Sequence, residues 1–126
     1  MVMRPGQLKP NEFEVAILER ILADHADVHV DISGLHVLSR TFTGVGSYTT
    51  FLTAKGGERR ILRTAARIDV AGLRDGLGNV VFMSGDELEM LELYTYGDEK
   101  WDGVYAGFVI DGDAGNGPAG SCGHIE

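Results

Sequence analysis

The sequence has one cysteine and no long apolar run, and each shortage excludes a class of protein. With Cys122 as the only cysteine among 126 residues, an intrachain disulfide cannot form. No apolar run approaches the roughly 20 residues that a membrane-spanning helix needs. The start also lacks the apolar core of a signal peptide. We therefore expect a cytoplasmic protein with no membrane partner.

Basic residues are also scarce. The chain has 11 lysines and arginines against 19 aspartates and glutamates, which gives a formal net charge of −8. An acidic surface repels phosphate backbones, so we expect no nucleic-acid partner. Apolar residues make up 44% of the chain and charged residues 24%, as in an ordinary globular protein.

Two patterns typical of ligand-binding loops occur in the sequence, and both are incomplete. Residues 115–120 match the glycine pattern of dinucleotide-binding loops, but Pro118 and the glycines around it prevent the helix that the pattern must open. Asp111 and Asp113 begin a calcium-loop pattern, whose twelfth position holds Cys122 instead of a carboxylate. We expect no catalytic residue, no metal and no cofactor, and therefore favour a protein that is not an enzyme.

One short run is dense in metal-ligand side chains. His25 and His29 would share a face of a helix, and His25, His29 and Asp31 would share a face of a strand. A weak metal site there stays open as one interpretation. The simpler interpretation is a polar surface at the end of a helix, where histidine is favoured.

An amphipathic helix begins near Asn11. Asn11 can cap free amides, and Glu14 stands three residues later, the spacing of a capping box. The alternative places Lys9 at the cap and Pro10 at the first helical position. We expect the helix to end near residues 24–25, and residues 26–34 fit a short strand or a turn of helix. The apolar stripe of the predicted N-terminal helix consists of Phe13, Ile17, Leu18, Ile21 and Leu22.

Residues 35–110 are typical of consecutive strands with short connections. The clearest hairpin joins residues 80–83 to 88–96. In its second arm the apolar residues change parity, which predicts a β-bulge near Met90 and Leu91. Short connections favour antiparallel pairing. The other candidate strands are residues 35–43, 47–54, 59–71 and 103–110.

The predicted fold class is therefore α+β. An N-terminal amphipathic helix packs on an antiparallel sheet of five or six strands. Residues 1–110 form this single domain. Residues 111–126 form a mobile glycine-rich tail, because they cannot bury enough apolar surface to offset the entropy of ordering.

Charge is distributed unevenly along the predicted strands. The charged residues of segment 55–74 are mostly basic, and the charged residues of segment 86–102 are mostly acidic. One interpretation is cross-strand pairing of arginines with glutamates. The other is a recognition surface for a basic protein partner, because aromatic side chains lie among carboxylates there. Core or edge packing of the aromatics is the alternative. The binding residues of this surface are Glu89, Glu92, Tyr94, Tyr96, Asp98, Glu99 and Trp101.

Three segments resemble blocks in a group of small uncharacterised bacterial proteins. They are residues 13–18, the T-G-V-G turn within 40–46, and the L-E-x-Y-x-Y-G-D pattern within 88–98. The resemblance covers residues 8–110 and implies one bacterial domain with no established activity. At the level of the fold alone, the layout also resembles immunity proteins that neutralise toxins.

The sequence thus predicts a non-enzymatic, protein-binding module with an acidic-aromatic surface, of which an immunity-like protein is one version. The alternative is a small-ligand-binding protein or enzyme with a pocket between helix and sheet. Homo-oligomers built through sheet edges or exposed aromatics are a third interpretation. For the pocket, the polar candidates are Glu89, Glu92, His29 and His36.

Overall fold

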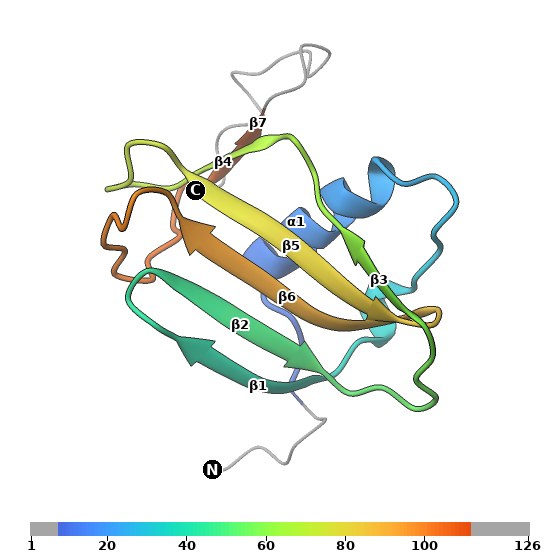
Figure 1. The fold of residues 1–126 in the computed structure, drawn as a ribbon. Helices are drawn as coiled ribbons and strands as arrows, with labels where there is room; N and C mark the ends of the chain where they lie inside the picture. The colour runs from blue at the N-terminus through green and yellow to red at the C-terminus, as the bar shows by residue number, and fades with distance from the viewer. Residues whose placement is uncertain (1–7, 112–126) are drawn as a thin grey trace.

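The computed structural model describes residues 8–111, in which one helix covers one face of a seven-stranded antiparallel sheet. Figure 1 shows the helix, α1, behind the sheet, with the long central strands in front of it. The predicted α+β class is confirmed, and the sheet has seven strands instead of the predicted five or six. The predicted tail lies outside the described residues except for Asp111, which ends the last strand.

Helix α1 (Glu12–Ala23) begins as its sequence predicts. Asn11 is the N-cap. Its side chain accepts from the Glu14 amide at 2.8 Å, and the Glu14 carboxylate accepts from the Asn11 amide at 2.9 Å. The alternative start with Lys9 as cap is wrong. A 3₁₀ turn, η1 (Ile32–Gly34), follows, so residues 26–34 form no strand.

The strands do not follow one another across the sheet in chain order. Their order is β1-β2-β6-β5-β4-β7, and β3 pairs with β5 at the end away from β4. Strands consecutive in the chain pair in three cases, β1 with β2, β4 with β5 and β5 with β6. The others do not, because the long β5–β6 hairpin occupies the centre and β2 pairs with β6. The strands are β1 (Val37–Phe42), β2 (Gly46–Phe51), β3 (Arg59–Leu62), β4 (Arg67–Asp69), β5 (Leu77–Ser84), β6 (Glu87–Thr95) and β7 (Val109–Asp111).

The predicted strand 59–71 is divided into β3 and β4. Between them, the buried Asn79 side chain accepts from the Thr64 amide at 2.8 Å and donates to the Thr64 carbonyl at 3.1 Å. One side chain of β5 thus supplies the hydrogen bonds that a neighbouring strand would have made.

The predicted strand 103–110 is mostly a loop, and only its end belongs to β7. Gly103 and Gly107 have φ values of 84° and 74°, a conformation that a strand does not contain. The loop instead covers the beginning of α1, where Tyr105 stacks on Phe13 at 4.8 Å between ring centroids. Phe108 meets the same ring edge-on at 4.9 Å.

The predicted β-bulge is present, one residue earlier than expected. Phe82 pairs with Met90 and Met83 pairs with Leu88, which leaves Glu89 as the extra residue. The bulge brings Leu88, Leu91 and Leu93 to the helix side of the sheet, and places Met90 on the opposite face.

Adjacent positions of β6 should therefore differ sharply in their contribution to stability. Leu91 is 1% exposed, whereas Met90 is half-buried on the uncovered side. We expect Leu91→Ala to lower the free energy of unfolding by about 2–5 kcal/mol. Met90→Ala should lower it by less than about 1.5 kcal/mol. Urea unfolding of the two variants measures both values, and equal losses would contradict the register.

The β5–β6 hairpin also holds the loop between β2 and β3. The Glu87 carboxylate accepts from the backbone amides of Ala54 and Lys55 at 2.9 Å and of Gly56 at 3.2 Å. These bonds lower the pKa of Glu87 below its usual value of 4.5.

This contact predicts a defined pH dependence. A carboxyl whose pKa is depressed by folding stabilises the protein above the unfolded-state pKa, and the stabilisation is lost as the pH falls through the folded-state value. We expect Glu87→Gln to destabilise the protein at about pH 7 and to flatten the decline toward about pH 3. Asp86→Asn is the control, since that exposed side chain makes only a 4.0 Å contact to Lys55. Parallel pH profiles of Glu87→Gln and the unsubstituted protein would contradict this role.

Candidate functional sites on the two sides of the sheet

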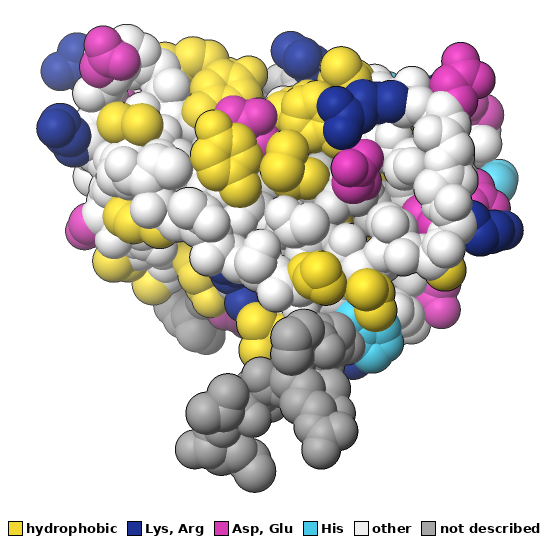
Figure 2. Space-filling view, turned by 60° about the horizontal axis from the view of Figure 1, so that its bottom comes forward, with side chains coloured by type: hydrophobic (Ala, Val, Ile, Leu, Met, Phe, Trp, Pro, Cys, Tyr) yellow, Lys and Arg dark blue, Asp and Glu magenta, His cyan; other side chains and the backbone are white. Residues whose placement is uncertain are grey.

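The side of the sheet that α1 does not cover is an aromatic and apolar surface, which we call the open face. In Figure 1 no helix lies in front of it, and Figure 2 shows hydrophobic side chains gathered in its upper part with charged side chains among them. Tyr48 is 38% exposed, Tyr96 46% and Ile61 53%. The open face consists of Tyr48, Thr50, Ile61, Val80, Phe82, Met90, Glu92, Tyr94 and Tyr96.

Glu92 lies near the centre of the open face. It is directly opposite Tyr48 on β2 and Val80 on β5. Among the described residues, no cation lies within ion-pair distance of its carboxylate, and no hydrogen-bond donor reaches it. The cross-strand pairing expected for the acidic run therefore does not extend to this residue.

Two tyrosines continue the open face along β6. Tyr94 covers Gly78, since a Cβ added there would come within 2.2 Å of the ring. Tyr94 and Tyr96 meet edge to face, with ring centroids 5.7 Å apart. Burial raises the pKa of the Tyr96 hydroxyl, and nearby Tyr94 adds to the rise. The Tyr96 hydroxyl therefore keeps its proton at physiological pH and can donate a hydrogen bond.

At the rim of the open face the expected arginine–glutamate pairing does occur. Arg59 on β3 lies 3.4 Å from Glu89 on β6, and its guanidinium is 5.3 Å from the centre of the Phe82 ring. The arginine side chain is 63% exposed, so solvent screens this pair and it contributes little to stability.

The remaining predicted binding residues lie elsewhere. The Glu99 carboxylate accepts from the Arg74 amide at 2.8 Å, and Asp98 lies in the loop after β6 with a φ of 62°. Trp101 is 6% exposed and packs on the helix side, with its ring centroid 6.5 Å from Phe13. The structure brings together Glu92, Tyr94 and Tyr96, has Glu89 at their rim, and separates the other three from them.

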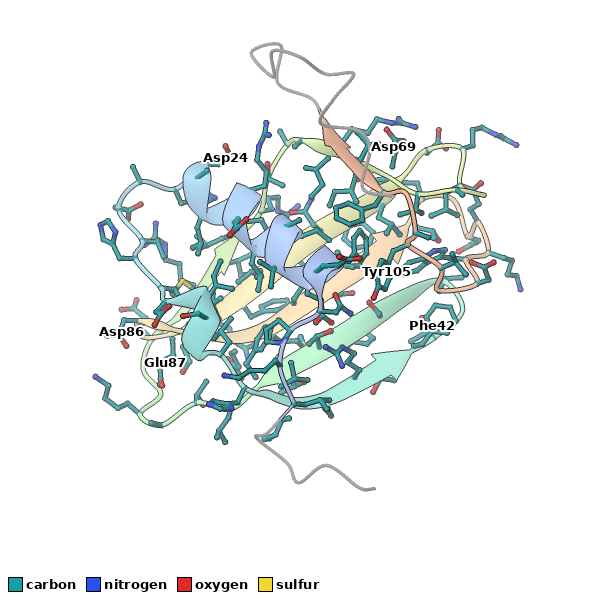
Figure 3. All side chains as sticks on the ribbon, turned by 180° about the vertical axis from the view of Figure 1, so that it is seen from behind. Asp24, Phe42, Asp69, Asp86, Glu87 and Tyr105 are labelled. Carbon is teal, nitrogen blue, oxygen red and sulfur yellow. The ribbon has the colours of Figure 1, made fainter. Side chains whose placement is uncertain are left out.

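On the helix side, the first turn of α1, strands β1 and β2 and the loop at 101–105 form a cavity of about 300 Å³ that is open to solvent on one side, which we call the aromatic cavity. In Figure 3, Tyr105 lies beside the beginning of α1, and Phe42 lies at the end of β1. The cavity is lined by Phe13, Phe42, Trp101 and Tyr105, with Glu14, Arg40, Ser47 and Thr49 as polar side chains and Asn11, Thr41, Leu93, Asp102 and Gly103 completing the wall.

A buried carboxylate organises this cavity. Glu14 is 4% exposed, and each of its oxygens accepts two hydrogen bonds. Arg40 reaches it in bidentate fashion, with Nε and Nη2 both at 2.7 Å, and the Thr49 hydroxyl donates at 2.8 Å. Hydrogen bonding to Glu14 raises the pKa of Arg40. The ion pair and the four hydrogen bonds offset the cost of burying this carboxylate.

A pocket between helix and sheet is therefore present, although its polar groups differ from the predicted ones. Glu89 and Glu92 lie on the other side of the sheet, and neither His29 nor His36 lines the cavity. The capping-box pattern pointed to Glu14, but sequence spacing cannot show that the same carboxylate also binds a strand 26 residues away.

No metal centre is assembled in the part of the chain that the structure describes. Residues 8–111 contain no group of three histidine, cysteine, aspartate or glutamate side chains that could hold an ion. His25 Nε2 lies 3.0 Å from the Arg63 carbonyl, and Asp31 caps η1 by accepting from the Ser33 amide. In the same residues, no helix is long and apolar enough to cross a bilayer.

The chain matches no protein-family model, no curated protein and no solved structure. A functional conclusion therefore has to come from the two surfaces themselves.

The network around Glu14 should stabilise the protein measurably. Thr49→Val removes one donor from a buried carboxylate without changing the shape of the side chain. We expect a loss of about 1.5–3 kcal/mol in the free energy of unfolding, because hydrogen bonds to charged groups are worth that much. Thr50→Val, on the opposite face of the same strand, should change it by less than about 0.5 kcal/mol. Similar values for both variants in urea unfolding would refute the assignment.

Proposed function

We propose that the protein binds a protein partner through the open face, with a lysine or arginine of the partner placed at Glu92. The observation that carries the proposal is an unpaired carboxylate in the middle of an exposed aromatic and apolar sheet face. Surfaces of this composition are common in interfaces, where tyrosines contribute large contact areas at low entropic cost.

The neighbours of Glu92 suit a basic side chain. Tyr48 stands directly opposite, and Tyr94 lies two positions along the same strand. A guanidinium or ammonium group inserted there would pair with the carboxylate and contact aromatic rings, each favourable for a cation. Excluding water from the pair strengthens it further.

The charge of the whole chain supports the same class of partner. A net charge of −8 attracts basic proteins over distances beyond direct contact and raises their association rate. Neutralisation of a basic toxin is one form that such binding would take.

A second copy of the chain fits the open face less well. Glu92 lies on β6, an inner strand of the sheet, so a two-fold axis near the centre of the face would place two carboxylates in one desolvated interface. Like charges in such a position cost several kcal/mol.

The proposal can be tested with an array of random 15-residue peptides and the labelled full-length protein. Bound peptides should be enriched in lysine or arginine next to apolar residues. Glu92→Gln should remove the preference for basic residues, since it deletes the charge and keeps the shape. Tyr48→Ala should weaken binding to the strongest peptides by about tenfold, the usual effect of truncating an interface tyrosine.

Phe42→Ala is the matched control. Phe42 is an aromatic residue of comparable exposure at 49%, but it lies on the helix side of the sheet. Its substitution should leave peptide binding unchanged. Binding without a basic preference, or equal losses in Tyr48→Ala and Phe42→Ala, would reject the open face. A dimer that light scattering detects and Tyr48→Ala disrupts would assign the face to a second copy instead.

A further inference from the structure

We infer that the aromatic cavity is a second binding site, which takes an uncharged, flat ring compound carrying a hydrogen-bond acceptor such as an amide or ring carbonyl. The inference is independent of the open face, because none of the open-face residues lines the cavity.

The size and walls of the cavity favour a flat ring. Its volume of about 300 Å³ exceeds that of a packing defect and reaches the lower range of small-molecule sites. Trp101 meets the Phe13 ring at an interplanar angle of 62° and the Phe42 ring at 75°. Aromatic surfaces in two orientations can stack on one ring and contact its edge at once.

The charge of the cavity favours a neutral molecule. The one cation among the described wall residues, Arg40, is already paired with Glu14 at 2.7 Å. The other carboxylate of the wall, Asp102, is exposed to solvent and accepts from the Val104 amide at 3.0 Å. A cationic ligand would meet the Arg40 guanidinium beside the aromatic rings, and solvent would screen the attraction of the exposed Asp102 carboxylate. An anionic ligand would lose its hydration without gaining a positive charge in return, because the Glu14 carboxylate already neutralises the Arg40 guanidinium.

The polar groups that remain available favour an acceptor on the ligand. The Nε and Nη2 groups of Arg40 donate to Glu14 and to the Lys9 carbonyl, which accounts for their hydrogens. The Nη1 group has no acceptor among the described residues, and neither does the Ser47 hydroxyl. A carbonyl oxygen of the ligand would satisfy a donor that the protein leaves unpaired.

The only tryptophan of the chain lines the cavity and reports on it directly. Its indole nitrogen donates to the Val104 carbonyl at 3.0 Å, which holds the ring in one position. The indole N–H resonance of Trp101 in a ¹H–¹⁵N correlation spectrum of the full chain can therefore be followed during titration with benzamide, benzoate and benzamidinium. These three probes share one shape and carry charges of zero, minus one and plus one.

We expect benzamide to shift the Trp101 signal to saturation with a dissociation constant on the order of 1 mM, ordinary for so small a ligand. Benzoate and benzamidinium should bind at least about fivefold more weakly, because a charged group gains no partner there. Phe42→Ala should weaken benzamide binding by about fivefold through the loss of one wall. Tyr48→Ala, on the open face, should leave it unchanged.

Phe42 is half-exposed, so its truncation should leave the fold intact, and the circular dichroism of the variant checks this. Arg40→Lys supplies a second variant, since it keeps the charge opposite Glu14 but removes the Nη1 donor. It should also weaken benzamide binding. No saturable shift of the Trp101 signal, equal binding of the three probes, or equal effects of Phe42→Ala and Tyr48→Ala would overturn the inference. Each of these results leaves the peptide binding of the open face untouched.

Discussion

Within residues 8–111, a single α-helix of 12 residues has to cover one side of a seven-stranded sheet. Such a helix is about 18 Å long and about 10 Å wide, enough to cover the middle of a sheet whose strands lie about 4.8 Å apart, but not its margins. Ile17, Leu18 and Ile21 therefore cover the centre, where Val81 and Leu91 are fully buried. Loops have to cover what remains. Val28 and Leu35 do so beyond the end of the helix, and Trp101 and Phe108 do so near its beginning.

Both candidate sites follow from this shortage of covering structure. The chain has no described helix for the second side, so that side remains exposed as the open face. On the helix side of the sheet, the cavity lies between α1 and the loop at 101–105. There Glu14 connects the helix to strands β1 and β2. Its carboxylate completes the cap of α1, binds Arg40 of β1 and accepts from Thr49 of β2. A satisfied polar group at such a position holds three elements in one arrangement more specifically than apolar contact alone would.

The parts that local patterns determine were predictable from the sequence. The spacing of Asn11 and Glu14 predicted the start of the helix. The change of parity in β6 predicted the bulge that places Leu91 and Met90 on opposite faces of the sheet. Strand order was not predictable, because pairing β2 with β6 depends on contacts across some 40 residues of chain rather than on spacing. The positions of the candidate binding residues were predictable only in part. Tyr94 and Tyr96 share the expected face, but Trp101 follows a reversal after Gly97 and passes to the other side of the sheet, where it is buried.

The character of the open face depends on the sign of one charge. A sheet face with Tyr48, Ile61 and Tyr96 exposed would invite association with any apolar surface, and a charged group in its middle opposes this. A charge of either sign at that position would oppose such association. The open face already has Arg59 at its rim, and this arginine is paired with Glu89 instead of with Glu92. In the proposed binding role, a carboxylate left unpaired while Arg59 lies on the same sheet would discriminate between partners. It would admit a basic side chain and reject an acidic one, at a cost in the free protein of only its own partial desolvation.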